Sequence, residues 1–174
     1  MIEPGRKVLD RSELRRQVHS LHTAGKQIVF TNGCFDLLHI GHIRYLHKAR
    51  CQGDRLVVAV NSDRSVRELK GPPRPIVPED ERAEIVAALA AVDLVTIFDE
   101  LDPLELVRQL KPDVLVKGAD WQRQDIVGAS EVEAAGGRVV RVKLEPHISS
   151  SILLQRIASE MATGYGTGGR KDET

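Results

Sequence analysis

Short apolar runs alternate with amphipathic stretches along most of the chain. Five runs consist mainly of apolar residues and predict strands that are buried on both faces: 27–30, 55–60, 92–98, 113–116 and 138–142. Between them, apolar positions recur every three or four residues, which is typical of helices that pack one side against a core. The alternation predicts an α/β fold, a Rossmann-like parallel five-stranded sheet with helices on both faces.

The predicted helices have recognisable beginnings and ends. In the stretch 12–24, Leu14, Val18 and Leu21 share one face, and Gly25 follows as a natural helix stop. Further helices are expected at 41–53, 103–110 and 130–135, and a last helix begins after the serines at 149–151.

Acidic residues at 79–81 favour the start of another helix, because negative charge stabilises a helix N-terminus. We expect this helix to direct Ile85, Val86 and Leu89 inward.

Two segments are expected to lack regular structure. We predict a loop over 61–78, because Gly71 and the prolines around it oppose a helix. Glycine, threonine and charged residues dominate 163–174, which predicts a disordered tail. The remaining residues, 1–162, are predicted to form a single domain.

Polar loops marked by glycine or serine follow four of the predicted strands. They are residues 32–42, 61–74, 117–121 and 149–151. In an open parallel sheet, ligands bind beyond the carboxyl ends of the strands, where the strand order reverses. We therefore expect these loops to meet at one edge of the sheet and to build a single site.

The loop after the first strand carries the most specific chemical signal. His39 and His42 are three residues apart where a strand gives way to a helix, and Gly41 leaves room for the backbone to approach a phosphate. Free N–H groups at a helix start and imidazole donors suit the negative charge of a nucleotide triphosphate. The alternative, a capping histidine beside a structural one, is disfavoured by Gly33 upstream and by the strand-to-helix context.

The other loops offer groups for the rest of a nucleotide. Lys70 and Arg74 lie on a proline-constrained loop and are candidate phosphate ligands, whereas the common alternative for such residues is solvation. Ser149, Ser150 and Ser151 offer hydroxyl and N–H groups at a helix start, where a phosphate could bind. The alternative is simple capping of the helix, for which one serine would be enough. Gly118 and Asp120 suit a base and a ribose, because glycine permits close approach and a carboxylate accepts hydroxyl hydrogens. Cys34 is interpreted as a packing residue, since no base accompanies it.

Charge and cysteine content narrow the classes of partner. The 174 residues contain 25 Lys and Arg and 25 Asp and Glu, which gives no support for a nucleic-acid or membrane surface. Cys34 and Cys51 lie in unlike settings and indicate no disulfide framework. Neither a signal-peptide core nor a run long enough to span a bilayer is present in the sequence. A cytoplasmic location is the expectation.

Two signatures resemble those of the nucleotidyltransferases of the cytidylyltransferase-like superfamily. They are Gly33-x-Phe35-Asp36-x-x-His39-x-Gly41-His42 and Ile148-Ser149-Ser150-Ser151. A closer resemblance, over about residues 25–157, is to the adenylyltransferases of ADP-heptose synthesis. It rests on the segments Thr31-Asn32-Gly33-Cys34-Phe35-Asp36-Leu37-Leu38-His39, Val60-Asn61-Ser62-Asp63, Lys70-Gly71, Arg74-Pro75, Glu81-Arg82 and Val116-Lys117-Gly118-Ala119-Asp120-Trp121.

This resemblance implies that ATP and D-glycero-β-D-manno-heptose 1-phosphate react to give ADP-heptose and pyrophosphate. It assigns His39 and His42 to the α-phosphate and Lys70 to phosphate binding. Mg²⁺ is expected to be held mainly by phosphate oxygens and water, with Asp36 a candidate helper and no metal ligand assigned. Arg82 is expected to support a loop or to contact phosphate. The residues implied to bind the nucleotide are Asn32, Gly33, Cys34, Phe35, Gly41, Arg82, Gly118, Asp120, Ser149, Ser150 and Ser151.

The resemblance also implies a set of partners. The substrates are small molecules, and we expect a homo-oligomer, with a dimer as the simplest form. Many relatives of this kind are joined to a sugar kinase. No kinase half is visible in this sequence, so we expect the stand-alone form and a separate heptose kinase.

One departure from the superfamily pattern weakens an assignment as a cytidylyltransferase. Many cytidylyltransferases carry Arg-Thr-x-Gly before the serine motif, where this chain has residues 144–147, and Lys143 or Arg141 is a candidate replacement for the missing arginine. The nearest alternative is a cytidylyltransferase acting on glycerol 3-phosphate or another phospho-alcohol. An aminoacyl-tRNA synthetase-like domain would also carry the two histidines, but the second, lysine-rich signature is missing. A non-catalytic nucleotide sensor is the third alternative.

Overall fold

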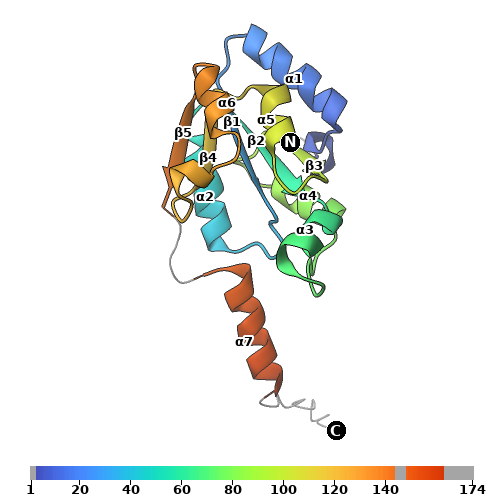
Figure 1. Cartoon of the computed structure of the whole chain (residues 1–174). Coiled ribbons are helices and arrows are strands. Elements are labelled where there is room, and N and C mark those ends of the chain that lie inside the picture. Colours follow the sequence, from blue (N-terminus) through green and yellow to red (C-terminus); the bar gives the residue numbers. More distant parts are fainter. Residues whose placement is uncertain (1–2, 144–147, 163–174) are drawn as a thin grey trace.

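The computed structural model describes residues 3–143 and 148–162, and its centre is a parallel sheet of five strands (Figure 1). The strand order is β3-β2-β1-β4-β5. The strands are β1 (Ile28–Gly33), β2 (Arg55–Asn61), β3 (Leu94–Phe98), β4 (Val114–Gly118) and β5 (Arg138–Val142). The chain builds outward from β1 to β3, returns to pair β4 with the other side of β1, and then adds β5. The predicted fold class is confirmed.

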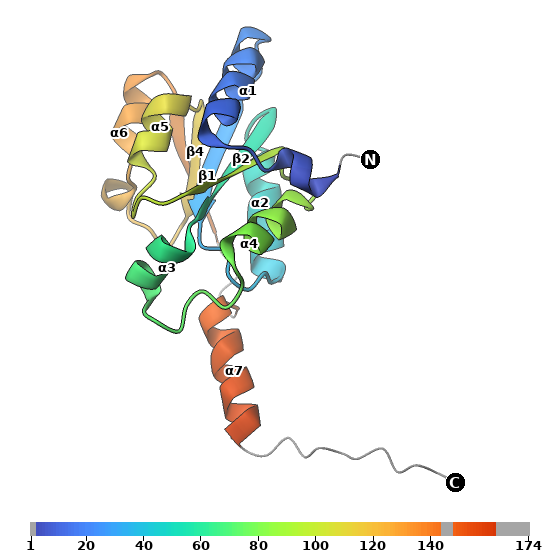
Figure 2. The ribbon, with the colours of Figure 1, turned by 90° about the vertical axis from the view of Figure 1, so that its right-hand side faces the viewer.

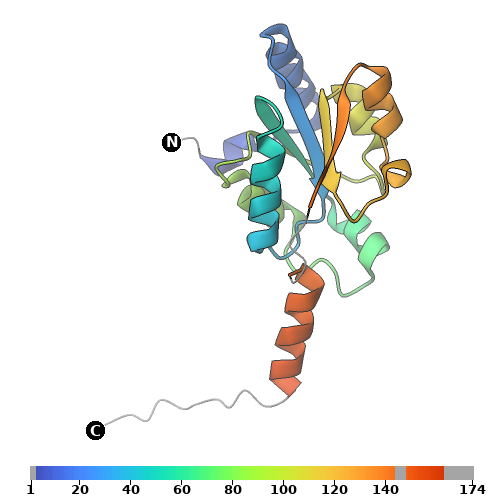
Figure 3. The same cartoon turned by 90° about the vertical axis from the view of Figure 1, so that its left-hand side faces the viewer.

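Two layers of helices cover the sheet, because adjacent residues of each strand point to opposite faces. On one face, α2 (Ile40–Arg50) and α4 (Glu79–Ala87) pack against the apolar side chains of the strands. On the other, α1 (Arg11–Thr23), α5 (Leu104–Leu110) and α6 (Ala129–Ala134) do so, as Figures 2 and 3 show from two sides. Every strand is therefore buried on both faces, which explains the nearly continuous apolar runs.

Local capping explains where α1 begins and ends. The Asp10 carboxylate accepts a hydrogen bond of 2.8 Å from the Glu13 N–H, and Leu14 and Val18 are buried one turn apart. Gly25 follows the helix with a φ of +71°, which a residue with a side chain rarely adopts. The predicted apolar face and the predicted glycine at the helix end are thus both present, although the helix begins one residue earlier than expected.

The predicted loop at 61–78 is partly wrong, because it contains the helix α3 (Asp63–Lys70). Ser62 caps this helix by accepting a hydrogen bond of 3.1 Å from the Ser65 N–H, and Val66 is fully buried. The prolines begin only after Gly71, which ends the helix with a φ of +94°. Lys70 is consequently the last residue of a helix and not a residue of an extended loop.

Strand ends and one buried position also differ from expectation. β1 continues through Gly33 and β4 through Gly118, so polar residues that we placed in loops pair with neighbouring strands. In α4, Val86 is buried as expected, but the Ile85 side chain is 45% exposed. The elements at 103–110, 130–135 and 138–142 are found within one residue of their predicted bounds.

The last helix, α7 (Ser150–Ala162), projects from the edge where the strands end, away from both helical layers (Figures 1 and 3). Two short 3₁₀ turns, Pro4–Lys7 and Arg123–Asp125, complete the described elements. The predicted tail at 163–174 and the departure at 144–147 lie outside the described residues. No helix within the described ranges has the length and apolar character needed to cross a membrane.

Candidate active site

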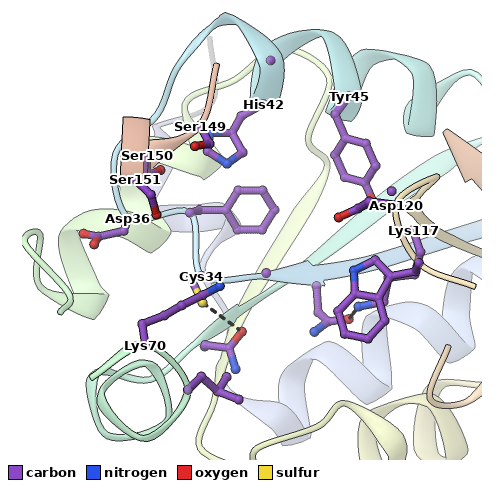
Figure 4. A pocket seen from close by; sticks show the side chains of 18 of the residues that line it. Cys34, Asp36, His42, Tyr45, Lys70, Lys117, Asp120, Ser149, Ser150 and Ser151 are labelled. Carbon is purple, nitrogen blue, oxygen red and sulfur yellow. Dashed lines mark hydrogen bonds between the residues drawn. The ribbon is translucent and has the colours of Figure 1, made fainter. Parts of the chain in front are cut away.

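A cavity of about 790 Å³ opens at the carboxyl ends of β1 and β4, where the strand order reverses. All four predicted loops contribute to its wall, and Figure 4 shows side chains from these segments facing one another. The predicted site residues that line it are Asn32, Gly33, Cys34, Phe35, His39, Gly41, His42, Lys70, Gly118, Asp120, Ser149, Ser150 and Ser151. Arg82 is the one predicted site residue that does not line the cavity.

The two histidines lie at the start of α2, on the side of the cavity. His39 is the residue before the helix and His42 lies in its first turn, and their rings stack with centroids 3.9 Å apart. The Phe35 ring is tilted against His42 at a centroid distance of 5.4 Å. A Cβ atom on Gly41 would lie 2.9 Å from His39 Nδ1, so a side chain there would displace the His39 ring.

Hydrogen bonding indicates which nitrogen of a neutral His42 ring carries the hydrogen. The His39 backbone N–H donates to His42 Nδ1 over 3.4 Å, which leaves the hydrogen of a neutral ring on Nε2. Burial, together with the neighbouring His39, lowers the pKa of His42 to about 4, and burial also lowers the pKa of His39. Among the described residues, His39 Nδ1 is buried without a hydrogen-bond partner. Both rings are therefore neutral donors at pH 7 with unused polar capacity.

The serine run reaches the same cavity from the other end of the chain. Ser149 caps α7 by accepting a hydrogen bond of 3.2 Å from the Ile152 N–H, and the Ser150 hydroxyl donates to the Leu37 carbonyl at 2.9 Å. Ile148 also packs near Gly41, since a Cβ at Gly41 would lie 3.3 Å from Ile148 Cγ2. The backbone N–H groups of the first turn thus lie close to the histidines, a combination that suits a polyanion.

Asp36 and Arg74 hold the loop beyond Lys70 in place. The Asp36 carboxylate pairs with the Arg74 guanidinium and accepts hydrogen bonds from the N–H groups of Ile76 at 2.8 Å and Val77 at 3.0 Å. The Asp36 side chain is 1% exposed. These contacts occupy Asp36, so it does not offer a free carboxylate to Mg²⁺, and Arg74 is engaged as well. Lys70 is exposed and lines the cavity.

Arg82 corrects one of our expectations, because it lies beneath the site and not in its wall. Its guanidinium is fully buried and donates to the Cys34 carbonyl at 2.5 Å and the Val77 carbonyl at 2.8 Å, and it pairs with Asp63 at 2.7 Å. All its polar groups are used in joining three segments. Of the two expected roles, loop support fits these contacts, and phosphate contact does not.

Three further residues organise the site and received no role from the sequence. The buried Tyr45 hydroxyl lies 2.7 Å from Thr31 Oγ1 and donates to the Val116 carbonyl at 3.0 Å, which fixes α2 against β1 and β4. The Asn61 amide donates to Ser65 Oγ at 3.1 Å, at the end of β2. Lys117 lies at the end of β4. In the sequence, it belongs to the segment from Val116 to Trp121 that carries the resemblance, directly before Gly118, and received no role of its own.

Cys34 lines the cavity beside Asn61, with its Sγ atom 4.0 Å from the amide oxygen. Burial raises the pKa of the Cys34 thiol above its ordinary value, which disfavours the thiolate that a nucleophile requires. The environment is compatible with the packing role expected from the sequence.

Known proteins share the sequence and the fold of this chain. The cytidylyltransferase-like family model matches residues 30–156. The chain belongs to the cytidylyltransferase-like family. It is 56% identical over 150 residues to bifunctional protein HldE of Koribacter versatilis and 48% identical over 158 residues to that of Magnetococcus marinus. These alignments cover 86% and 91% of this chain but 31% and 32% of the relatives, so the chain spans about a third of their length.

Two solved structures have a fold similar to that of this chain. The lipopolysaccharide core biosynthesis protein from Thermoplasma volcanium is 32% identical, with a TM-score of 0.60, over 70% of this chain and 99% of that one. Pantoate-beta-alanine ligase from Francisella tularensis, at 15% identity and a TM-score of 0.56 over 93% of this chain and 81% of that one, shares the fold. The predicted family resemblance is confirmed.

Replacing Arg82 with Met is expected to lower the free energy of unfolding by about 3–5 kcal/mol, because Asp63 and two buried carbonyls lose their partner. Urea unfolding at pH 7 measures the change. Arg67→Met, an exposed position on α3, is the matched control and should change stability by less than about 0.5 kcal/mol. Equal stability of the two variants would contradict the bridging role.

The pKa of His42 predicts how stability depends on pH. Because the pKa is about 4 in the folded protein and the ordinary value is 6.5, the unfolded chain binds more protons between these values. The contribution of His42 to stability is therefore complete above pH 6.5 and declines as the pH falls toward 4. Relative to His42→Gln, the wild type should lose free energy of unfolding between pH 7 and pH 5.

Urea titrations of both proteins at these two pH values test this difference. His47→Gln, on the exposed side of the same helix, serves as the control and should keep the wild-type dependence. An identical pH dependence of the wild type and His42→Gln would show that His42 is not held neutral.

Proposed function

We propose that the chain transfers the adenylyl group of ATP to D-glycero-β-D-manno-heptose 1-phosphate, releasing pyrophosphate and ADP-heptose. The observation that carries the proposal is the convergence of two neutral imidazoles and a serine-capped helix start on one cavity at the switch point of the sheet. The cytidylyltransferase-like family, the similarity to proteins named HldE and the likeness to a lipopolysaccharide core biosynthesis protein support the choice of reaction and sugar.

The reaction needs positioning and charge stabilisation more than proton transfer. A phosphate oxygen of the sugar 1-phosphate attacks the α-phosphorus of ATP, the bond from that phosphorus to the β-phosphate bridging oxygen breaks, and the electron pair leaves with pyrophosphate. The attacking oxygen is already ionised, so the protein needs no general base. Donors that face the α-phosphate then supply the main rate effect.

The residues around the cavity divide this work. His42, through its Nε2–H, and His39 donate to the α-phosphate oxygens as negative charge increases on them. The N–H groups of Ser150 and Ser151 and the exposed Lys70 hold the β- and γ-phosphates. Gly118 and Asp120 line the nucleoside part. The anionic ligand favours protonation of the imidazoles, which opposes the effect of burial.

The chain's own side chains do not fit a separate magnesium site. Within residues 3–143 and 148–162, no group of three or more His, Cys, Asp and Glu side chains could hold a metal ion, and Asp36 is occupied by Arg74 and two N–H groups. We therefore assign no step to a protein-bound metal. Mg²⁺ is proposed to enter with ATP, as the complex that serves as substrate.

Location and assembly extend this proposal. We place the enzyme in the cytoplasm, where ATP is available and where its two free cysteines stay reduced. A homodimer and a heptose kinase acting before this step complete the proposal, the kinase activity residing on a separate chain or on a longer form of this one.

Release of pyrophosphate tests the reaction and its specificity together. The purified chain is assayed with ATP or CTP, each with heptose 1-phosphate, glucose 1-phosphate or glycerol 3-phosphate. The proposal predicts turnover with ATP and heptose 1-phosphate that exceeds every other pair. Turnover with CTP and glycerol 3-phosphate would establish the cytidylyltransferase alternative instead, and ATP binding without turnover would establish a sensor.

His42→Ala is expected to lose about 2–4 kcal/mol of transition-state stabilisation, which corresponds to a large fall in kcat with ATP affinity little changed. Single-turnover kinetics at saturating ATP measures the loss. His47→Ala, an exposed histidine on the same helix, should turn over at the wild-type rate. Wild-type turnover in His42→Ala would remove His42 from the mechanism.

A further inference from the structure

Lys117 is a buried cation in the wall of the cavity that the mechanism above does not use. It lies at the carboxyl end of β4, in register with Arg141 of β5, and is 9% exposed. Lysine side chains are rarely buried to this extent unless a negative charge accompanies them.

The protein supplies Lys117 with little compensation for its burial. Its Nζ donates to the amide oxygen of Asn32 and lies 5.7 Å from the centre of the Trp121 ring, and both groups are uncharged. Among the described residues, Lys117 forms no ion pair with a carboxylate, and Asp120 acts on it only through its charge at longer range. Of the three hydrogens of the ammonium group, two are therefore available to a ligand.

Burial has a measurable consequence for this amine. It lowers the pKa of Lys117 to about 8, against the opposing influence of Cys34 and Asp120. An anion bound beside Nζ would stabilise the protonated amine and would raise its pKa again. The combination of cavity position, uncharged partners and unused donors therefore indicates an anion subsite.

The chemistry of the reaction indicates which anion binds there. In an in-line displacement, the attacking and leaving oxygens lie on opposite sides of the α-phosphorus. Figure 4 shows Lys117 and the serines of α7 on opposite sides of the His42 ring. If the serines hold the leaving pyrophosphate, Lys117 lies on the side from which the entering phosphate would approach.

We propose that Lys117, oriented by Asn32 and covered by Trp121, binds the phosphate group of the acceptor and directs it toward the α-phosphate. The ligand class is a phosphate monoester dianion, here a sugar 1-phosphate, so this inference rests on the proposed function. The subsite is separate from the Lys70 and serine groups that hold the nucleotide phosphates.

The kinetic test uses Lys117→Met, which keeps an unbranched apolar stem, ends one atom short of Nζ and removes the charge. Loss of a charge-assisted hydrogen bond should raise the KM for the sugar 1-phosphate by about 10- to 100-fold. The dissociation constant for ATP, measured by calorimetry, should stay within about twofold of wild type. Lys26→Met, an exposed position at the opposite edge of the sheet, is the control and should leave both constants unchanged.

A spectroscopic readout makes the test independent of turnover. Trp121 is the single tryptophan of the chain, so its fluorescence reports directly on the neighbourhood of Lys117. Inorganic phosphate, titrated in the presence of a non-hydrolysable ATP analogue, should change this fluorescence saturably in the wild type and Lys26→Met but not in Lys117→Met. Thermal unfolding followed by circular dichroism confirms that Lys117→Met is folded.

The outcomes separate the two proposals. Wild-type turnover combined with an unchanged acceptor KM in Lys117→Met overturns the subsite and leaves the adenylyltransferase reaction intact. An equal loss of ATP and acceptor affinity also overturns it, because Lys117 would then bind the nucleotide. Should the wild type release no pyrophosphate with any acceptor, the proposed function fails, and the phosphate titration alone then decides whether Lys117 binds an anion.

Discussion

The parallel pairing of β1 with β4 is the constraint on which the whole site depends. On one side of β1 the sheet continues with β2 and β3, and on the other side it continues with β4 and β5. The connections after β1 and β4 therefore run in different directions and leave a cavity between them. The Tyr45 hydroxyl holds α2 against β1 and β4, since it contacts both Thr31 and the Val116 carbonyl. The start of α2, with its two histidines, is thereby held over the gap.

The cavity contains polar groups that the protein itself leaves unused. His39 Nδ1 lacks a partner among the described residues, Lys117 has an uncharged acceptor, and the first turn of α7 presents free N–H groups. By contrast, the Arg82 guanidinium beneath the site and the Asp36 carboxylate in its wall are fully engaged and hold the loops in place. Such a preorganised set of donors suits a ligand that brings several negative charges.

Much of this arrangement could be predicted from the sequence. Strands that are buried on both faces appear as nearly continuous apolar runs, and phosphate-binding loops are marked by glycines. The failures have physical causes. α3 was missed since the prolines after Gly71 masked a short capped helix, and Arg82 was misplaced since a buried arginine looks like a surface one until its partners are known. The role of Lys117 does not follow from its place in the motif, because only the folded chain shows that its burial goes uncompensated.

A crystal structure with Mg²⁺ and α,β-methylene-ATP would show whether the imidazoles and the serine run bind one triphosphate. We expect an α-phosphate oxygen within about 3 Å of His42 Nε2 and the β- and γ-phosphates at the N–H groups of Ser150 and Ser151. A triphosphate bound away from both imidazoles, or a serine run that makes no contact with it, would contradict the account.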